Sequence, residues 1–196
     1  MDNSRNSKTR ILTEGAIMIA MAFVLSYIKI FRLPWGGSIT LLSMLPIIVY
    51  SIKRGVKAGL FAAFLSALLQ LGQGIVIDGL LGWGLTPVML ISCIFLDYIG
   101  AYTVIGLGGI FREKGLGGAV AGTVIAVLLR YVFHVISGAV IFHSSGMIWE
   151  TFSTENEWIY SAVYNGAYML PEMIFTVIGA AVLLKVPQTR RLLTEA

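Results

Sequence analysis

Long uninterrupted apolar runs are the feature that most limits what this chain can fold into. Hydrophobic residues make up 57% of its 196 residues and charged residues only 12%, whereas a soluble domain carries about 25% charged residues. A helix needs about 20 mostly apolar residues to cross a bilayer, and runs of this kind recur along the sequence. The composition therefore excludes a water-soluble globule and a disordered chain, and it predicts an all-α integral membrane protein.

Six apolar runs predict six transmembrane helices. The runs are continuous and lack the alternation of apolar and polar residues that a β-barrel requires. The gaps between them are short, so we expect a single membrane domain over residues 1–196. The predicted spans cover residues 11–30, 38–52, 56–77, 87–111, 116–142 and 158–185, of which the second is short.

Basic residues gather in alternate gaps between these runs. Of the 14 Lys and Arg residues, only Lys29 and Arg32 fall on the opposite side, and Arg130 falls inside a span. The positive-inside rule then places both termini in the cytoplasm. The pI near 9.3 thus reflects membrane topology, and we expect no nucleic-acid partner. The remaining basic residues are Arg5, Lys8, Arg10, Lys53, Arg54, Lys57, Arg112, Lys114, Lys185, Arg190 and Arg191.

Motifs that would indicate enzymatic chemistry are absent from the sequence. There is no G-x-x-x-x-G-K-[ST] phosphate-binding loop and no H-E-x-x-H or Cys/His cluster, so neither ATP hydrolysis by that route nor a zinc site is expected. There is no G-x-S-x-G nucleophile motif either. Cys93 is the only cysteine, which excludes an intrachain disulfide. We expect no metal, no cofactor and no catalytic residues.

Ionisable residues inside the spans are the candidate functional positions, because burying such groups in a bilayer is costly. Asp97, Arg130 and His134 stand out. The rise of 1.5 Å per residue places Asp97 about 15 Å and His134 about 12 Å from the outer ends of their spans. Asn165 lies at a depth of about 10 Å, and Tyr160 lies nearer the outer surface. These groups converge on the outer half of the membrane, which predicts a pocket that opens outward.

The residue types in this region suit a flat cationic ligand. Asp97 supplies a negative charge in a low-dielectric setting, and aromatic faces attract cations. His134 and Asn165 offer hydrogen-bond donors and acceptors for ring nitrogens and amino groups. The aromatic residues near these positions are Tyr98, Tyr131, Tyr160, Tyr164, Tyr168 and Phe142, with Trp35 and Trp83 in outer loops.

The same residues also allow purely structural interpretations. Asp97 and Arg130 can form a buried ion pair, and His134 can hydrogen-bond a backbone carbonyl. Asn165 can join two helices by a hydrogen bond. The three tyrosines at positions 160, 164 and 168 follow an i, i+4, i+8 spacing, which is more often typical of helix packing than of ligand contact.

The first span carries a pattern of small residues. Ala16 and Ala20 form a small-xxx-small pair beside Gly15, and such a face lets a second helix approach closely. The second helix can belong either to a partner protein or to this chain.

Three segments resemble the thiamine-specific substrate-binding (S) components of energy-coupling factor transporters, the ThiT/YuaJ type. They are Leu96-Asp97-Tyr98, residues 129–138 (LRYVFHVISG) and residues 160–171 (YSAVYNGAYMLP). The resemblance implies a six-helix S component with cytoplasmic termini in a prokaryotic cell membrane. It implies high-affinity binding of thiamine from outside. It also implies two kinds of partner, a transmembrane coupling protein of the EcfT type and two cytoplasmic ATPases.

The resemblance further implies roles for individual residues. Asp97 stands at the family's pocket carboxylate, and His134, Tyr160 and Asn165 stand at other ligand contacts. Trp35 falls where the family has a tryptophan in the first outer loop. Phe142 replaces a pocket tryptophan of some members, and Trp83 is a candidate substitute for a further aromatic contact. The small-residue pair of the first span, Ala16 and Ala20, is implied to dock on the coupling protein.

Three alternative functions remain open from the sequence. The chain can be an S component for another flat vitamin or precursor, such as riboflavin or the pyrimidine moiety of thiamine. It can be an intramembrane enzyme in which Asp97 and His134 act as an acid–base pair near Ser137. It can also be a structural membrane subunit without a ligand.

Overall fold

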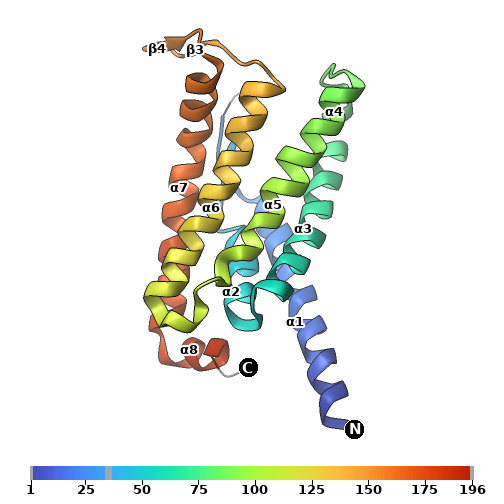
Figure 1. The fold of residues 1–196 in the computed structure, drawn as a ribbon, viewed down its shortest axis with the longest axis vertical. Coiled ribbons are helices and arrows are strands. Elements are labelled where there is room, and N and C mark those ends of the chain that lie inside the picture. The colour runs from blue at the N-terminus through green and yellow to red at the C-terminus, as the bar shows by residue number, and fades with distance from the viewer. Residues whose placement is uncertain (1, 34–36, 195–196) are drawn as a thin grey trace.

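The computed structural model describes residues 2–33 and 37–194, with side chains from residue 8 to residue 193. Its helices stand side by side in one bundle, and α1 begins at the same end at which α8 finishes (Figure 1). Five helical segments are long and apolar enough to cross a membrane. They are Lys8–Tyr27, Val56–Val76, Pro87–Gly109, Arg112–Val140 and Glu157–Lys185.

A short hairpin follows the first helix. Helix α1 (Asp2–Tyr27) ends before Lys29, and strand β1 (Lys29–Arg32) pairs antiparallel with β2 (Ser38–Thr40). The predicted first span, residues 11–30, therefore extends too far. Its last residues hydrogen-bond to the returning strand instead of continuing the helix, as the bond from the Leu41 amide to the Ile28 carbonyl shows.

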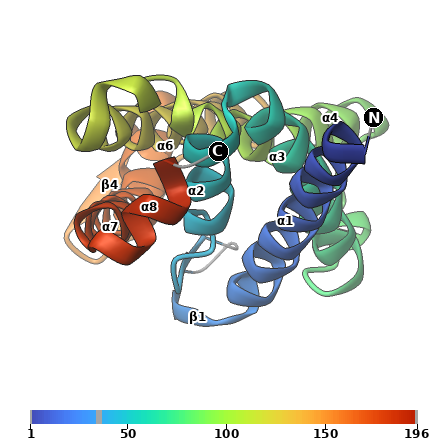
Figure 2. The same ribbon diagram turned by 90° about the horizontal axis from the view of Figure 1, so that it is seen from below.

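The second predicted span differs most from the structure. Residues 38–40 form β2, and the helix that follows, α2 (Leu45–Arg54), has only ten residues. Such a helix is about 15 Å long, half the thickness of the hydrocarbon core. Pro46 lies in its first turn, where proline favours the start of a helix. Because α2 lies in the middle of the bundle (Figure 2), with Leu45 to Ile52 all buried, its apolar run belongs to the protein core.

Helix α2 is joined closely to α3 (Val56–Val76) and to the 3-10 segment η4 (Val104–Gly109). The Ser51 hydroxyl donates to the Gly106 carbonyl at 2.5 Å and accepts from the Gly109 amide at 3.0 Å. A Cβ atom on Gly59 would overlap both Ser51 and the Gly106 carbonyl oxygen. Glycine is therefore needed here for close approach of the three backbones.

The segment Pro87–Gly109, called the fourth crossing below because it matches the fourth predicted span, changes helix type along its length. After the short 3-10 turn η2 (Leu80–Gly82), it runs through α4 (Pro87–Cys93), the π-helical segment η3 (Ile94–Gly100), α5 (Ala101–Thr103) and η4. The Thr86 hydroxyl caps α4 by accepting from the Met89 amide at 3.3 Å. A π-helical turn is rare and frequently marks a functional site, and this one contains Asp97.

The last two crossings pack side by side. After the 3-10 turn η5 (Arg112–Lys114), α6 (Gly115–Val140) leads to a second hairpin, β3 (Gly146–Trp149) and β4 (Phe152–Thr154). Asn156 caps α7 (Glu157–Lys185) by accepting from the amides of Trp158 and Ile159. Helix α8 (Pro187–Thr194) ends the described chain. The second hairpin lies at the opposite end of the bundle from the start of α1 (Figure 1).

The main apolar core surrounds α2, with Ile48 completely buried. A smaller cluster around Leu80, Cys93 and Ile141 lies between α3, α4 and the end of α6. Large apolar side chains also cover the outside of the helices; Leu12, Val76 and Val88 are 67%, 81% and 74% exposed. An outer surface of this kind is what a protein surrounded by lipid presents, which confirms the predicted membrane class.

Candidate ligand-binding site

The carboxylate of Asp97 lies at the contact of the fourth crossing with α6. Its Oδ1 is 2.8 Å from Nδ1 of His134, and its Oδ2 accepts from the Ser137 hydroxyl. The side chains of Asp97 and His134 are only 17% and 12% exposed. The two residues that the sequence places at similar depth are thus in direct contact.

His134 connects Asp97 to a buried arginine. Nε of Arg130 lies 3.4 Å from Nε2 of His134, and its guanidinium stands 4.1 Å above the centre of the Tyr102 ring. Among the described side chains, Asp97 and Arg130 form no direct ion pair, so the simple pair considered from the sequence is replaced by a chain through His134.

Asn165 fixes a second set of polar groups on α7. Its Nδ2 donates to the Ser161 carbonyl at 2.9 Å and to the His134 carbonyl at 3.3 Å. Its Oδ1 accepts from the Tyr168 hydroxyl at 2.6 Å. The Tyr168 ring meets the His134 ring at 6.3 Å between centroids. The Asn165 side chain therefore holds α6 to α7 beside the Asp97 contact.

The first hairpin, formed by β1 and β2, contacts a line of aromatic side chains on α7. Tyr160 and Tyr164 stack with their ring centroids 6.3 Å apart, and the Tyr164 hydroxyl accepts from the Gly37 amide at 3.2 Å. Four residues after Tyr168, Glu172 continues the line and is 4% exposed.

Both the amide and the hydroxyl of Thr40 donate to Glu172. The hairpin is thus anchored inside the bundle at two levels of α7. The i+4 spacing from Tyr160 to Glu172 places these side chains on one face of α7, but it does not show which element packs against that face.

The other aromatic candidates pack against other partners. Tyr98 packs its hydroxyl against Gly74 of α3, and Tyr131 donates to the Ala162 carbonyl at 2.9 Å. Phe142 meets Trp83 at 6.2 Å between ring centroids, beyond the end of α6. Trp35 lies outside the described residues.

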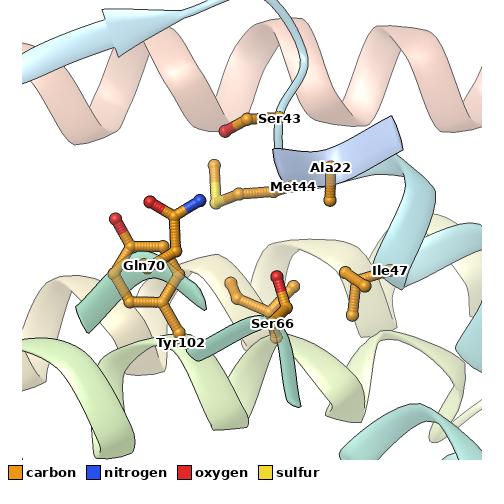
Figure 3. A pocket seen from close by; sticks show the side chains of 8 residues that line it. Ala22, Ser43, Met44, Ile47, Ser66, Gln70 and Tyr102 are labelled. Atoms are coloured by element: carbon orange, nitrogen blue, oxygen red, sulfur yellow. The ribbon is translucent and has the colours of Figure 1, made fainter. Parts of the chain in front are cut away.

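A small cavity lies between α1, α2, α3 and the fourth crossing. Ser43, Ser66, Gln70 and Tyr102 give it polar walls, and Met44 and Ile47 are among its apolar ones (Figure 3). Its volume of about 10 Å³ is the space of about one water molecule. Sites for small organic ligands occupy roughly 300–1,000 Å³, so this cavity is too small to hold one.

The small-residue pair of the first span faces outward. Ala16 and Ala20 are exposed, whereas Gly15, between the same turns, packs against the Tyr50 hydroxyl. Internal packing of α1 therefore uses Gly15, and the face with Ala16 and Ala20 is available to a neighbour.

The fold and the site together define a class of protein: a multi-pass membrane protein that encloses a polar, aromatic-walled cluster among its helices. Over residues 12–191 the chain matches the family described as thiamine transporter protein. It belongs to that family, and its role is transport rather than catalysis.

Individual relatives agree with this assignment. The chain is 37% identical to the thiamine transporter ThiT of Bacillus subtilis over 85% of its own length and 86% of the relative's. It is 27% identical to ThiT of Lacticaseibacillus paracasei, over 90% and 87% of the two chains. The solved structure of ThiT from Listeria monocytogenes superposes with a TM-score of 0.72 at 27% identity, covering 93% of this chain and 98% of that one.

Proposed function

We propose that this chain is the thiamine-binding S component of an energy-coupling factor transporter and that it captures thiamine with high affinity from the outer face of the membrane. The observation that carries the proposal is the contact of Asp97 with His134 and Ser137 on a π-helical turn. Membership of the thiamine transporter family supports thiamine as the ligand. The contact of Asp97 with His134 and Ser137 supports the location of its binding site.

The chemistry of thiamine matches the residues of this site. Thiamine joins a permanently cationic thiazolium ring to an aminopyrimidine. Asp97 provides the counter-charge, and the rings of Tyr160 and Tyr164 provide flat faces that attract a cation. His134 and Asn165 provide donors and acceptors for the pyrimidine. Phe142 with Trp83 forms a further aromatic wall at the outer end.

Binding requires a rearrangement, because the polar groups of the site are bonded to one another. Asn165 is bonded to Tyr168 and Ser161, and the Tyr164 hydroxyl to the first hairpin. A buried polar group has to keep a partner, so thiamine replaces some of these bonds. The first hairpin is the element whose displacement makes room, since it is held on α7 by hydrogen bonds.

Competition for bound radiolabelled thiamine tests the choice of ligand. Unlabelled thiamine should displace the label at submicromolar concentration, while riboflavin, biotin and the isolated pyrimidine moiety should fail at a hundredfold excess. A site that requires both rings discriminates in this way, because an analogue that lacks one ring leaves buried groups unpaired. Displacement by riboflavin as effective as by thiamine would assign a different vitamin.

We also propose that α1 docks on a transmembrane coupling protein that works with two cytoplasmic ATPases. The exposure of Ala16 and Ala20 supports this, since small residues allow close helix contact. Replacing both by Leu should abolish co-purification with the coupling protein and leave thiamine binding intact. Ala121→Leu on α6, another exposed alanine, is the matched control and should co-purify normally.

A further inference from the structure

A basic groove lies at the end of the bundle where α1 begins and α8 ends. It is formed by the turn between α2 and α3 and by the residues around η5, and its volume is about 460 Å³. Arg54, Lys57, Arg112 and Lys114 line it, and Glu113 is the one acidic residue in its wall. Positive charge therefore dominates a concave surface far from the proposed thiamine site.

Some of the basic side chains at this groove are paired with a carboxylate, and others are not. Arg54 is paired with Glu14 of α1, at 2.7 Å between its guanidinium and the carboxylate, and Lys53 shares the same carboxylate at 3.1 Å. Among the described residues, Lys57, Arg112 and Lys114 have no acidic partner within 4.0 Å, and all three are exposed. No nearby carboxylate of the described residues therefore neutralises the charge of these three cations.

Two of the three cations are held in place. The Arg112 guanidinium donates to the Lys53 carbonyl at 3.2 Å and lies over Gly55, where a Cβ atom would sit 3.2 Å from its Nη1. The ammonium of Lys114 stands 5.1 Å above the centre of the Phe111 ring. Because these groups are positioned beforehand, an anion loses less affinity to the ordering of side chains.

The remaining wall of the groove is apolar. Val56, Ile110 and Phe111 line it beside the cations, and Ile110 is 46% exposed. The groove thus combines fixed cations with an apolar wall at the ends of membrane-spanning helices. Basic pockets of this kind bind the headgroups of anionic lipids.

We propose that this groove binds the phosphate of an anionic phospholipid from the inner leaflet. Arg112, Lys57 and Lys114 contact the phosphate, and the apolar wall contacts the start of the acyl chains. A bound lipid would tie the turn between α2 and α3 to η5, which have no acidic bridge of their own among the described residues.

Native mass spectrometry of the detergent-purified protein tests the proposal, with phosphatidylglycerol and phosphatidylcholine titrated separately. The parent protein should bind phosphatidylglycerol more tightly than phosphatidylcholine. In the triple variant K57Q/R112Q/K114Q its affinity should fall roughly a hundredfold, since each cation contributes about a fivefold factor. Lys185→Gln removes an exposed lysine from the end of α7, outside the groove, and should bind phosphatidylglycerol like the parent.

Other outcomes would overturn the proposal. Equal binding of the two lipids by the parent, or unchanged phosphatidylglycerol binding by the triple variant, removes the site. If the triple variant instead loses its coupling protein and keeps the lipid, the groove is a protein contact. Displacement of the lipid by millimolar inorganic phosphate would identify a site for free anions. Should the triple variant not fold, Arg112→Gln alone is expected to weaken binding about fivefold.

Discussion

Asp97 is the residue on which the proposed thiamine site depends, because it is the carboxylate that a cationic ligand would meet and it already contacts His134 and Ser137. Asp97→Asn keeps the shape and removes the charge. We expect thiamine affinity to fall by about thirtyfold or more, since truncating one partner of a buried charge pair costs about 2–5 kcal/mol. Isothermal titration calorimetry measures the change. Asp78→Asn, which removes a more exposed carboxylate paired with Lys29, should bind like the parent.

Ser137 is a positioning residue for that carboxylate. Its hydroxyl donates to Asp97 and is completely buried. Ser137→Ala should weaken thiamine binding about tenfold or somewhat more, because hydrogen bonds to charged groups contribute about 1.5–3 kcal/mol. The same calorimetric titration checks this, and Ser137→Thr should restore part of the loss. Unchanged affinity in the alanine variant would show that Asp97 is oriented by His134 alone.

For single residues, the sequence indicates the level along a span better than it indicates which neighbouring helix the side chain faces. Counting along the spans brings Asp97 and His134 to the same level, where they are in contact. Tyr98 follows Asp97 directly, yet successive residues of a helix point in different directions, and Tyr98 packs on α3 instead. The sequence shows Ser137 only as a neighbour of His134. Nothing in the spacing of these residues indicates that the Ser137 hydroxyl reaches Asp97.

The first hairpin is the element whose position the sequence conceals. Its anchor on Glu172 joins residues 132 positions apart, and no periodicity reveals a pairing between a loop and a helix. The apolar run at residues 38–52 predicts one span because it contains few polar residues. The run therefore does not show that β2 ends before α2 begins. The ends of α3 and α7, in contrast, fall within one residue of those predicted, since their apolar runs are bounded by charges or turns.

The anchor of the hairpin should contribute to stability. Thr40→Val removes the hydroxyl that donates to the buried Glu172 carboxylate and leaves one of its acceptor positions unpaired. We expect a loss of about 1–3 kcal/mol, visible as a lower midpoint in a thermal unfolding scan. Ser38→Ala on the same strand is the control and should unfold at the parent temperature. Equal midpoints for both variants would contradict the anchor.

Two glycines of α3 offer a matched test of its packing. A Cβ on Gly59 would overlap Ser51 and the Gly106 carbonyl, whereas a Cβ on Gly72 meets nothing within 4 Å. Gly59→Ala should therefore lower the thermal midpoint by several degrees. Gly72→Ala should leave it unchanged or raise it, because alanine favours the helix by about 0.5–1 kcal/mol. A similar response of both variants would argue against close contact of α2, α3 and η4.

For the whole molecule, the distribution of positive charge predicts the orientation in the membrane. Glu150 lies in the second hairpin and Gln188 in α8, at opposite ends of the bundle, and both are exposed. Cys93 is buried, so background labelling by a thiol reagent should be low. Glu150→Cys should react with a membrane-impermeant maleimide in intact cells, and Gln188→Cys only after permeabilisation. The reverse pattern would invert the molecule and place the aromatic site on the cytoplasmic side.

A calorimetric titration of the purified protein with thiamine tests directly whether this chain binds the vitamin. The arrangement of Asp97, His134 and Asn165 between the fourth crossing, α6 and α7 predicts one saturable site per chain with submicromolar affinity. It also predicts that the affinity falls sharply in Asp97→Asn. A folded protein that shows no heat of binding with thiamine, or that binds it equally well without the Asp97 charge, would contradict the account.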